Sequence, residues 1–213
     1  MSVLLSLLPA LLDVEPSAPP AGLHVEARTA SVYAGACHYG GESVTAGREA
    51  LVALRFDAGV VADVELAGAR IVLLLAADAN LEDEALVARA RAWIDAPDGA
   101  LQESALLIAA RRHLGARALE LERIEAADLV VDQSGEACAV VVPGVARLVA
   151  RSMPDRACCA MPQQVWYRPL GAVRGALVLL CEEFHVAAGE LRFERHDENN
   201  GFVARFGAAP GGD

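Results

Sequence analysis

The sequence has no lysine, so all 18 of its basic side chains are arginines. Aspartate and glutamate number 29, which gives a formal net charge of −11 at pH 7. A surface with so little positive charge has no electrostatic footprint for phosphate backbones or for anionic lipid. We therefore expect no nucleic-acid partner, although a protein partner or a homo-oligomer remains compatible with this composition.

The sequence also lacks a hydrophobic run long enough to cross a bilayer. The longest apolar stretch, Val3–Leu12, has the length of a signal-peptide core but has no basic segment before it and no clear cleavage site after it. The proline-rich stretch Asp13–Gly22 follows it and is typical of an extended linker. We predict an N-terminal segment and linker over residues 1–22, one β-rich domain over 23–207, and a disordered tail over 208–213. Cytoplasmic and exported locations are equally compatible with these residues.

Several catalytic signatures are absent. The chain contains no G-x-S-x-G, no P-loop, no dinucleotide-binding glycine pattern and no H-E-x-x-H. Its five cysteines are an odd number at ordinary density, which does not indicate a disulfide scaffold. No reaction is assignable, and an enzyme is the less favoured class.

Alternating and short apolar runs predict a soluble α+β domain that is mostly β, with an antiparallel sheet or sandwich. One principal helix is expected at about residues 98–114, capped by Asp95 or Asp98 and ended by Gly115. Two hairpins are also predicted. One joins residues 50–56 to 60–66, and the other joins residues 190–195 to 202–206.

The densest chemistry lies in one glycine-rich turn that contains Cys37, His38 and Glu42. Thiolate and imidazole are ligands for zinc or copper, and a carboxylate is a weaker one. The alternative is a buried cysteine beside an exposed histidine in a loop, without a metal.

A second group of sulfur ligands is the adjacent pair Cys158 and Cys159, with Met161 close behind. Three soft sulfurs would suit Cu(I). In an exported protein one of the pair could instead form a disulfide with Cys37, and in a cytosolic one both could be loop cysteines without a role.

The other cysteines and histidines are interpreted more plainly. Cys138 is predicted to lie in the core, and Cys181 and His185 are predicted to share one face of a strand. His24 and His113 are expected at the surface. The run His196-Asp197-Glu198 is expected to be a solvated turn.

The order of segments from about Arg28 to Phe206 resembles a bacterial family known as domain of unknown function 1326. The stretch from Ala30 to Cys37, with Glu42 after it, is similar to the family motif Cys-Asp-Val-Tyr-Thr-Gly-Pro-Cys. Trp166–Leu170 is similar to the Tyr-x-Pro-Leu that follows the family's Cys-Gly-Asn-Glu element. The first family cysteine is Ala30 here, and Cys158-Cys159-Ala160-Met161 stands near the degenerate second element. The resemblance implies no reaction, and it raises the expectation of export.

The leading hypothesis is a non-enzymatic β domain that binds a metal ion, copper or zinc, or acts through its thiols. The predicted ligands are Cys37, His38, Glu42, Cys158 and Cys159. The alternative is a binding or assembly module whose cysteines are incidental, and a third option is a thiol-dependent enzyme. The leading hypothesis requires the loop with Cys37 to lie beside the loop with Cys158 and Cys159.

Overall fold

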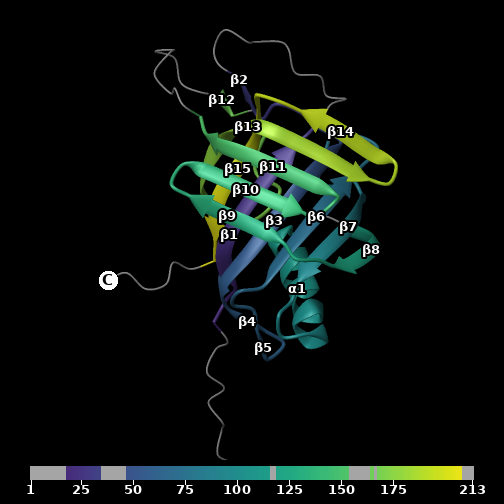
Figure 1. Cartoon of the computed structure of the whole chain (residues 1–213), viewed down its shortest axis with the longest axis vertical. Helices are drawn as coiled ribbons and strands as arrows, with labels where there is room; N and C mark the ends of the chain where they lie inside the picture. Colours follow the sequence, from purple (N-terminus) through teal and green to yellow (C-terminus); the bar gives the residue numbers. More distant parts are fainter. Residues whose placement is uncertain (1–17, 35–46, 116–118, 154–163, 166, 208–213) are drawn as a thin grey trace, which may run out of the picture.

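The computed structural model of the chain describes residues 18–34, 47–115, 119–153, 164–165 and 167–207 (Figure 1). This part of the chain is mostly β-strand and contains one α-helix, as the periodicity predicts. The elements, in chain order, are β1 Ala21–Arg28, β2 Tyr33–Ala34, β3 Glu49–Ala58, β4 Val60–Val61, β5 Val64–Glu65, β6 Arg70–Ala76, β7 Ala88–Asp95, α1 Ala100–His113, β8 Leu119–Ala126, β9 Val130–Ser134, β10 Ala137–Val142, β11 Ala146–Ser152, β12 Gln164–Val165, β13 Arg174–Ala188, β14 Leu191–Arg195 and β15 Glu198–Phe206.

Eleven strands form one curled sheet in the order β8-β7-β6-β3-β1-β15-β13-β11-β10-β9, with β14 paired to β13. The curl brings β9 back toward β3, where Arg55 Nη1 donates to the carbonyl of Val131 (3.2 Å) and pairs with Asp132 (3.1 Å). The prediction of a sandwich is therefore wrong, because a single sheet rolled into a half-barrel encloses its own core. The antiparallel prediction is largely confirmed. β7 and β8 alone in this sheet are parallel, because α1 provides the crossover between them.

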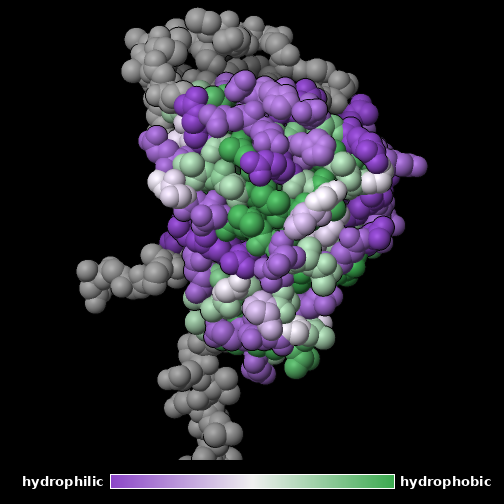
Figure 2. Space-filling model, in the orientation of Figure 1, coloured by the Kyte–Doolittle hydropathy of each residue, from purple (hydrophilic) through white to green (hydrophobic). Residues whose placement is uncertain are grey.

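The two faces of the sheet pack against different partners. The concave face holds a core that includes Leu23, Val25 and Leu51. Apolar side chains from β10, β11 and β13, on the opposite wall of the curled sheet, belong to the same core. The convex face of β3, β6 and β7 packs against α1 through residues such as Leu54, Ile71 and Leu106. Around these cores the surface is mainly hydrophilic, with one apolar area at the centre of the face shown in Figure 2.

The helix prediction for residues 98–114 is confirmed by α1, and the stop at Gly115 is confirmed by its φ of 70°. The predicted aspartate cap is wrong. Gly99 is the N-cap and no side chain caps the helix. The Asp98 carboxylate instead accepts from Gln102 Nε2 (3.0 Å), and Asp95 pairs with Arg70 (2.8 Å).

Both predicted hairpins are wrong in their pairing. β3 pairs with β1 and β6, and residues 60–65 form only a small ribbon, β4 with β5, that turns at Ala62 and Asp63 with positive φ. At the C-terminal end, β14 and β15 both pair with β13 and not with each other. The cause is the length of β13, which has 15 residues and offers successive partners to both strands.

Candidate functional site

All five predicted metal ligands, Cys37, His38, Glu42, Cys158 and Cys159, lie outside the described residues. Among the residues that the structure does describe, no group of three His, Cys, Asp or Glu side chains could hold a metal ion. The same part of the chain contains no helix that is long and apolar enough to cross a membrane.

The described ends of the two cysteine-containing segments meet in a small ribbon. β2 pairs antiparallel with β12, so that Ala34 lies opposite Gln164 and Tyr33 opposite Val165. Ala34 is the last described residue before Cys37, and Gln164 is the first described residue after Cys159. Figure 1 shows this ribbon at the end of the molecule opposite α1.

The other two cysteines belong to the core. Cys138 is 2% exposed, which confirms its predicted position, and Cys181 is fully buried. Burial, together with Asp132, raises the pKa of Cys138 to about 11, and burial with Glu198 and Cys138 nearby raises the pKa of Cys181 as well. Thiols of this kind stay protonated and unreactive at neutral pH.

The prediction that Cys181 and His185 share a face is wrong. Opposite β11, Val149 pairs with Glu183 and Ala150 with Cys181, so β13 carries one extra residue between these positions. Such a bulge reverses the side-chain alternation along the strand. His185 is therefore exposed where Cys181 is buried. His196 is exposed, as predicted, and hydrogen bonds to Glu194 and Glu182 raise its pKa.

A row of polar side chains runs along the convex face of β1 and is completely buried. His24, Glu26 and Arg28 alternate with the apolar residues of the concave face, and each has 0% exposure. His24 Nδ1 lies 2.9 Å from His113 Nε2, at the C-terminal end of α1. The expectation that His24 and His113 lie at the surface is therefore wrong, because α1 and the chain after β12 cover this face.

Hydrogen bonds link the side chains of this row to one another. Glu26 accepts from Arg28 Nε (2.6 Å) and lies 3.2 Å from His24 Nε2. The His24 Nε2–H group donates to this carboxylate, and a single proton is shared between His24 Nδ1 and His113 Nε2. Arg28 also reaches Glu82 (3.4 Å) at the edge of the row.

The charges of the row follow from this arrangement. Burial alone would raise the pKa of Glu26, but Arg28 and the hydrogen bond from His24 outweigh it and lower that pKa to about 2. Burial, and His24 beside it, lower the pKa of His113 to about 3. At neutral pH the row therefore contains an ionised glutamate paired with an arginine, and a neutral His113.

The chain that follows β12 lies across the row and runs antiparallel to β1. The amide of Leu170 donates to Glu26 (2.8 Å), the carbonyl of Arg168 accepts from Arg28, and the amide of Ala172 donates to the carbonyl of His113 (2.9 Å). The Tyr167 ring stacks near the Arg28 guanidinium, 5.4 Å from the ring centre. Residues 167–172, which we call the strap, are thus fixed by the polar row.

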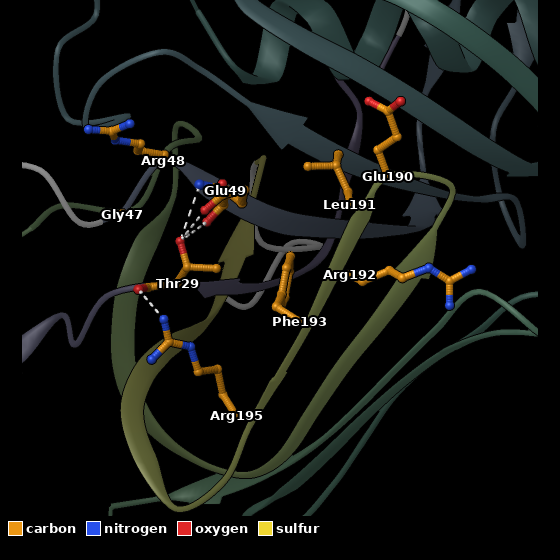
Figure 3. A pocket seen from close by; sticks show the side chains of 9 residues that line it. All are labelled: Thr29, Gly47, Arg48, Glu49, Glu190, Leu191, Arg192, Phe193 and Arg195. Atoms are coloured by element: carbon orange, nitrogen blue, oxygen red, sulfur yellow. Dashed lines mark hydrogen bonds between the residues drawn. The ribbon is translucent and has the colours of Figure 1, made fainter.

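A cavity of about 350 Å³ opens between β14 and the ends of β1 and β3 (Figure 3). Leu191 and Phe193 form an apolar wall, and Phe193 packs edge-on against Phe184 (5.0 Å between ring centres). Opposite them, Thr29 Oγ1 donates to the Glu49 carboxylate (2.7 Å). The cavity is therefore amphipathic, with one carboxylate facing an aromatic ring.

Sequence reasoning missed both the polar row and the cavity. The alternation His24-x-Glu26-x-Arg28 on a strand was the available signal, because all three side chains must share one face. Nothing local showed that this face would be covered. The cavity is formed by residues that follow β1, begin β3 and belong to β14, which are distant in the sequence, and it left no local pattern.

Comparisons of the chain with family models, with curated proteins and with solved structures gave no match. The resemblance to domain of unknown function 1326 therefore remains a prediction from the motifs alone.

Proposed function

We propose that this protein is a β domain that binds a metal ion, copper or zinc, or acts through its thiols, with Cys37, His38 and one of Cys158 and Cys159 as the principal groups. The antiparallel pairing of β2 with β12 is the observation that carries the proposal. It places the described ends of the two cysteine-containing segments side by side, as a shared site requires.

Chain length supports the same proposal. Cys37 follows Ala34 by three residues, and Cys159 precedes Gln164 by five. At about 3.3–3.6 Å per extended residue, these segments are long enough for the thiols to meet beside the ribbon. Sulfur and imidazole ligands within one such site would favour Cu(I) or Zn(II).

The burial of the other two cysteines indicates which thiols are available for metal binding or thiol chemistry. Cys138 and Cys181 are buried thiols with raised pKa values, so metal or thiol chemistry falls to the three remaining cysteines. All three belong to the segments that join the β2–β12 ribbon.

The polar row supports the proposal by holding the base of the ribbon. β1 leads from Arg28 toward β2, and the strap leads away from β12, so the Arg28 contacts to the Arg168 carbonyl and the Tyr167 ring tie the two together. The amide of Val32 also donates to the carbonyl of Asn199 (2.8 Å). A ribbon anchored on both sides is a preorganised support for a small site.

The test is metal titration of the reduced, purified chain with Cu(I) and Zn(II), followed by elemental analysis. We expect about one metal ion per chain for the wild type and a loss of at least about tenfold in affinity for Cys37→Ser. Cys138→Ala is the matched control, because it removes a thiol that lies in the core, and it should bind as the wild type does. A metal content below about a tenth per chain in all three proteins would contradict metal binding.

The thiol arm of the proposal is tested by iodoacetamide. A reaction at Cys37 faster than that of free cysteine at neutral pH would indicate a stabilised thiolate. Absence of both metal binding and enhanced reactivity would favour the alternative, a binding module with incidental cysteines, for which the cavity beside β14 is the structural argument.

A further inference from the structure

We propose that the cavity between β14 and the ends of β1 and β3 is a binding site for an aliphatic ammonium compound, with Glu49 as the charged anchor and Phe193 and Leu191 as the apolar wall. None of the residues that line this cavity is one of the proposed thiol or metal ligands. It can be tested whether or not the protein binds a metal.

Glu49 carries the argument for a cationic ligand. Its carboxylate accepts the Thr29 hydroxyl (2.7 Å), and Thr29 Oγ1 in turn lies 3.3 Å from the Glu49 amide, which orients the side chain at the cavity wall. Within the described part of the chain, no arginine or histidine lies at salt-bridge distance from Glu49. A half-buried carboxylate that none of the described arginines or histidines pairs with is a natural acceptor for an ammonium group.

The arginines of the cavity do not neutralise this carboxylate. Arg195 pairs with Glu198 (3.2 Å) and donates to the Thr29 carbonyl (3.3 Å). The side chains of Arg48 and Arg192 extend away from the space between Thr29 and Phe193 (Figure 3). Arg192 alternates with Leu191 and Phe193 along β14, so its side chain belongs to the other face of that strand.

The apolar wall specifies the rest of the ligand. Leu191 and Phe193 lie opposite the polar wall, and an aromatic face attracts a cation as well as its alkyl stem. A second carboxylate, Glu190, lies at the rim beyond Leu191 and adds negative potential. The volume of about 350 Å³ is at the lower end of the range for small-molecule sites, which suits an amine of several carbons.

The net charge of −11 acts in the same direction. A strongly acidic protein raises the local concentration of organic cations and lowers that of anions. This effect is general, whereas Glu49 makes it specific to one place.

The test is an NMR titration of the full-length, isotopically labelled chain with three probes of equal length: hexylamine, 1-hexanol and hexanoate. We expect hexylamine to shift the amide signals of Thr29, Glu49 and Phe193 and to bind at least about tenfold more tightly than 1-hexanol. Tighter binding of hexanoate would mean that the arginines define the site, and it would overturn the proposal.

Two variants test the anchor. Glu49→Gln keeps an oxygen for the Thr29 hydroxyl and should weaken hexylamine binding at least about fivefold, since it removes one partly buried charge pair. Glu136→Gln removes the same charge from an exposed turn outside the cavity and should leave binding unchanged. Equal weakening in both variants would show only general attraction to an acidic protein, and would overturn the assignment of Glu49.

Discussion

The two faces of β1 are equally buried and chemically opposite. Leu23, Val25 and Ala27 point into the concave core, and His24, Glu26 and Arg28 point to the convex side, all with 0% exposure. The first set packs among apolar side chains from the opposite wall of the half-barrel. The second set forms a hydrogen-bonded row between α1 and the strap.

The difference teaches how one strand combines stability with positioning. The concave face stabilises the fold by removing apolar area from water, an effect that has little directional preference. The convex face depends on geometry, because a buried charge is tolerated only when it is paired and hydrogen-bonded. The polar row therefore specifies where the strap and the base of the β2–β12 ribbon must lie.

The largest expected effect separates the two faces directly. Glu26→Ala leaves the Arg28 guanidinium buried without its main partner and should lower the free energy of unfolding by about 3–5 kcal/mol. Val25→Ala on the opposite face removes two methyl groups and should cost only about 2 kcal/mol. Urea unfolding at pH 7 measures both free energies. Equal losses would show that a substitution in the polar row destabilises the fold no more than one in the apolar core.

Close packing at the end of the row gives the next effect. A Cβ added at Gly171 would lie 2.1 Å from His113 Nε2, so Gly171→Ala should destabilise the fold by about 1–3 kcal/mol. Ala172→Ser changes the exposed neighbour and should stay within about 0.5 kcal/mol of the wild type. Adding His113→Ala should relieve part of the loss from Gly171→Ala. Full additivity of the two changes would mean that the strap does not press on this ring.

The smallest expected effect is a pH dependence confined to the convex face. The pKa of His113 in the folded state is about 3, below its ordinary value of 6.5, so between these values the unfolded state binds a proton that the folded state does not. Stability should therefore fall as the pH is lowered from 6.5 toward 3, by at most about 1.4 kcal/mol per pH unit from this group.

Unfolding curves between pH 6.5 and 5 test this dependence where Glu26 of the unfolded chain is still mostly ionised. His113→Gln keeps a hydrogen-bonding group beside His24 and should reduce the loss of stability across that interval by about 1–2 kcal/mol. An unchanged slope in His113→Gln would assign the dependence to other groups.

Local patterns predicted the elements of this fold better than their partners. The helix at residues 100–113 lies where periodicity and turn residues placed it, and Cys138 lies in the core as predicted. The C-terminal hairpin failed because β13 pairs with both β14 and β15, and the other hairpin failed because β3 pairs with β1 and β6. A single bulge in β13 was enough to reverse the predicted relation of Cys181 and His185.

The polar row and the cavity were harder to predict than the fold. His24 and His113 are 89 residues apart and meet at 2.9 Å only because α1 returns over the convex face of β1. Similarly, Glu49 and Phe193 come from strands that are distant in the chain. Polar residues on a strand are predicted to face solvent unless the segment that covers them is known.

The amino-acid sequence by itself determined the β-rich class, the position of the helix, the acidic charge and the concentration of soft ligands in two short segments. These properties follow from composition and from side-chain periods of 2 and 3.6, which are local. The tertiary structure decided that one sheet curls on itself, that a row of charges on β1 is buried, and that the described ends of both cysteine-containing segments pair. Each of these depends on contacts between residues far apart in the chain, whose free energy is realised only when the covering elements are in place.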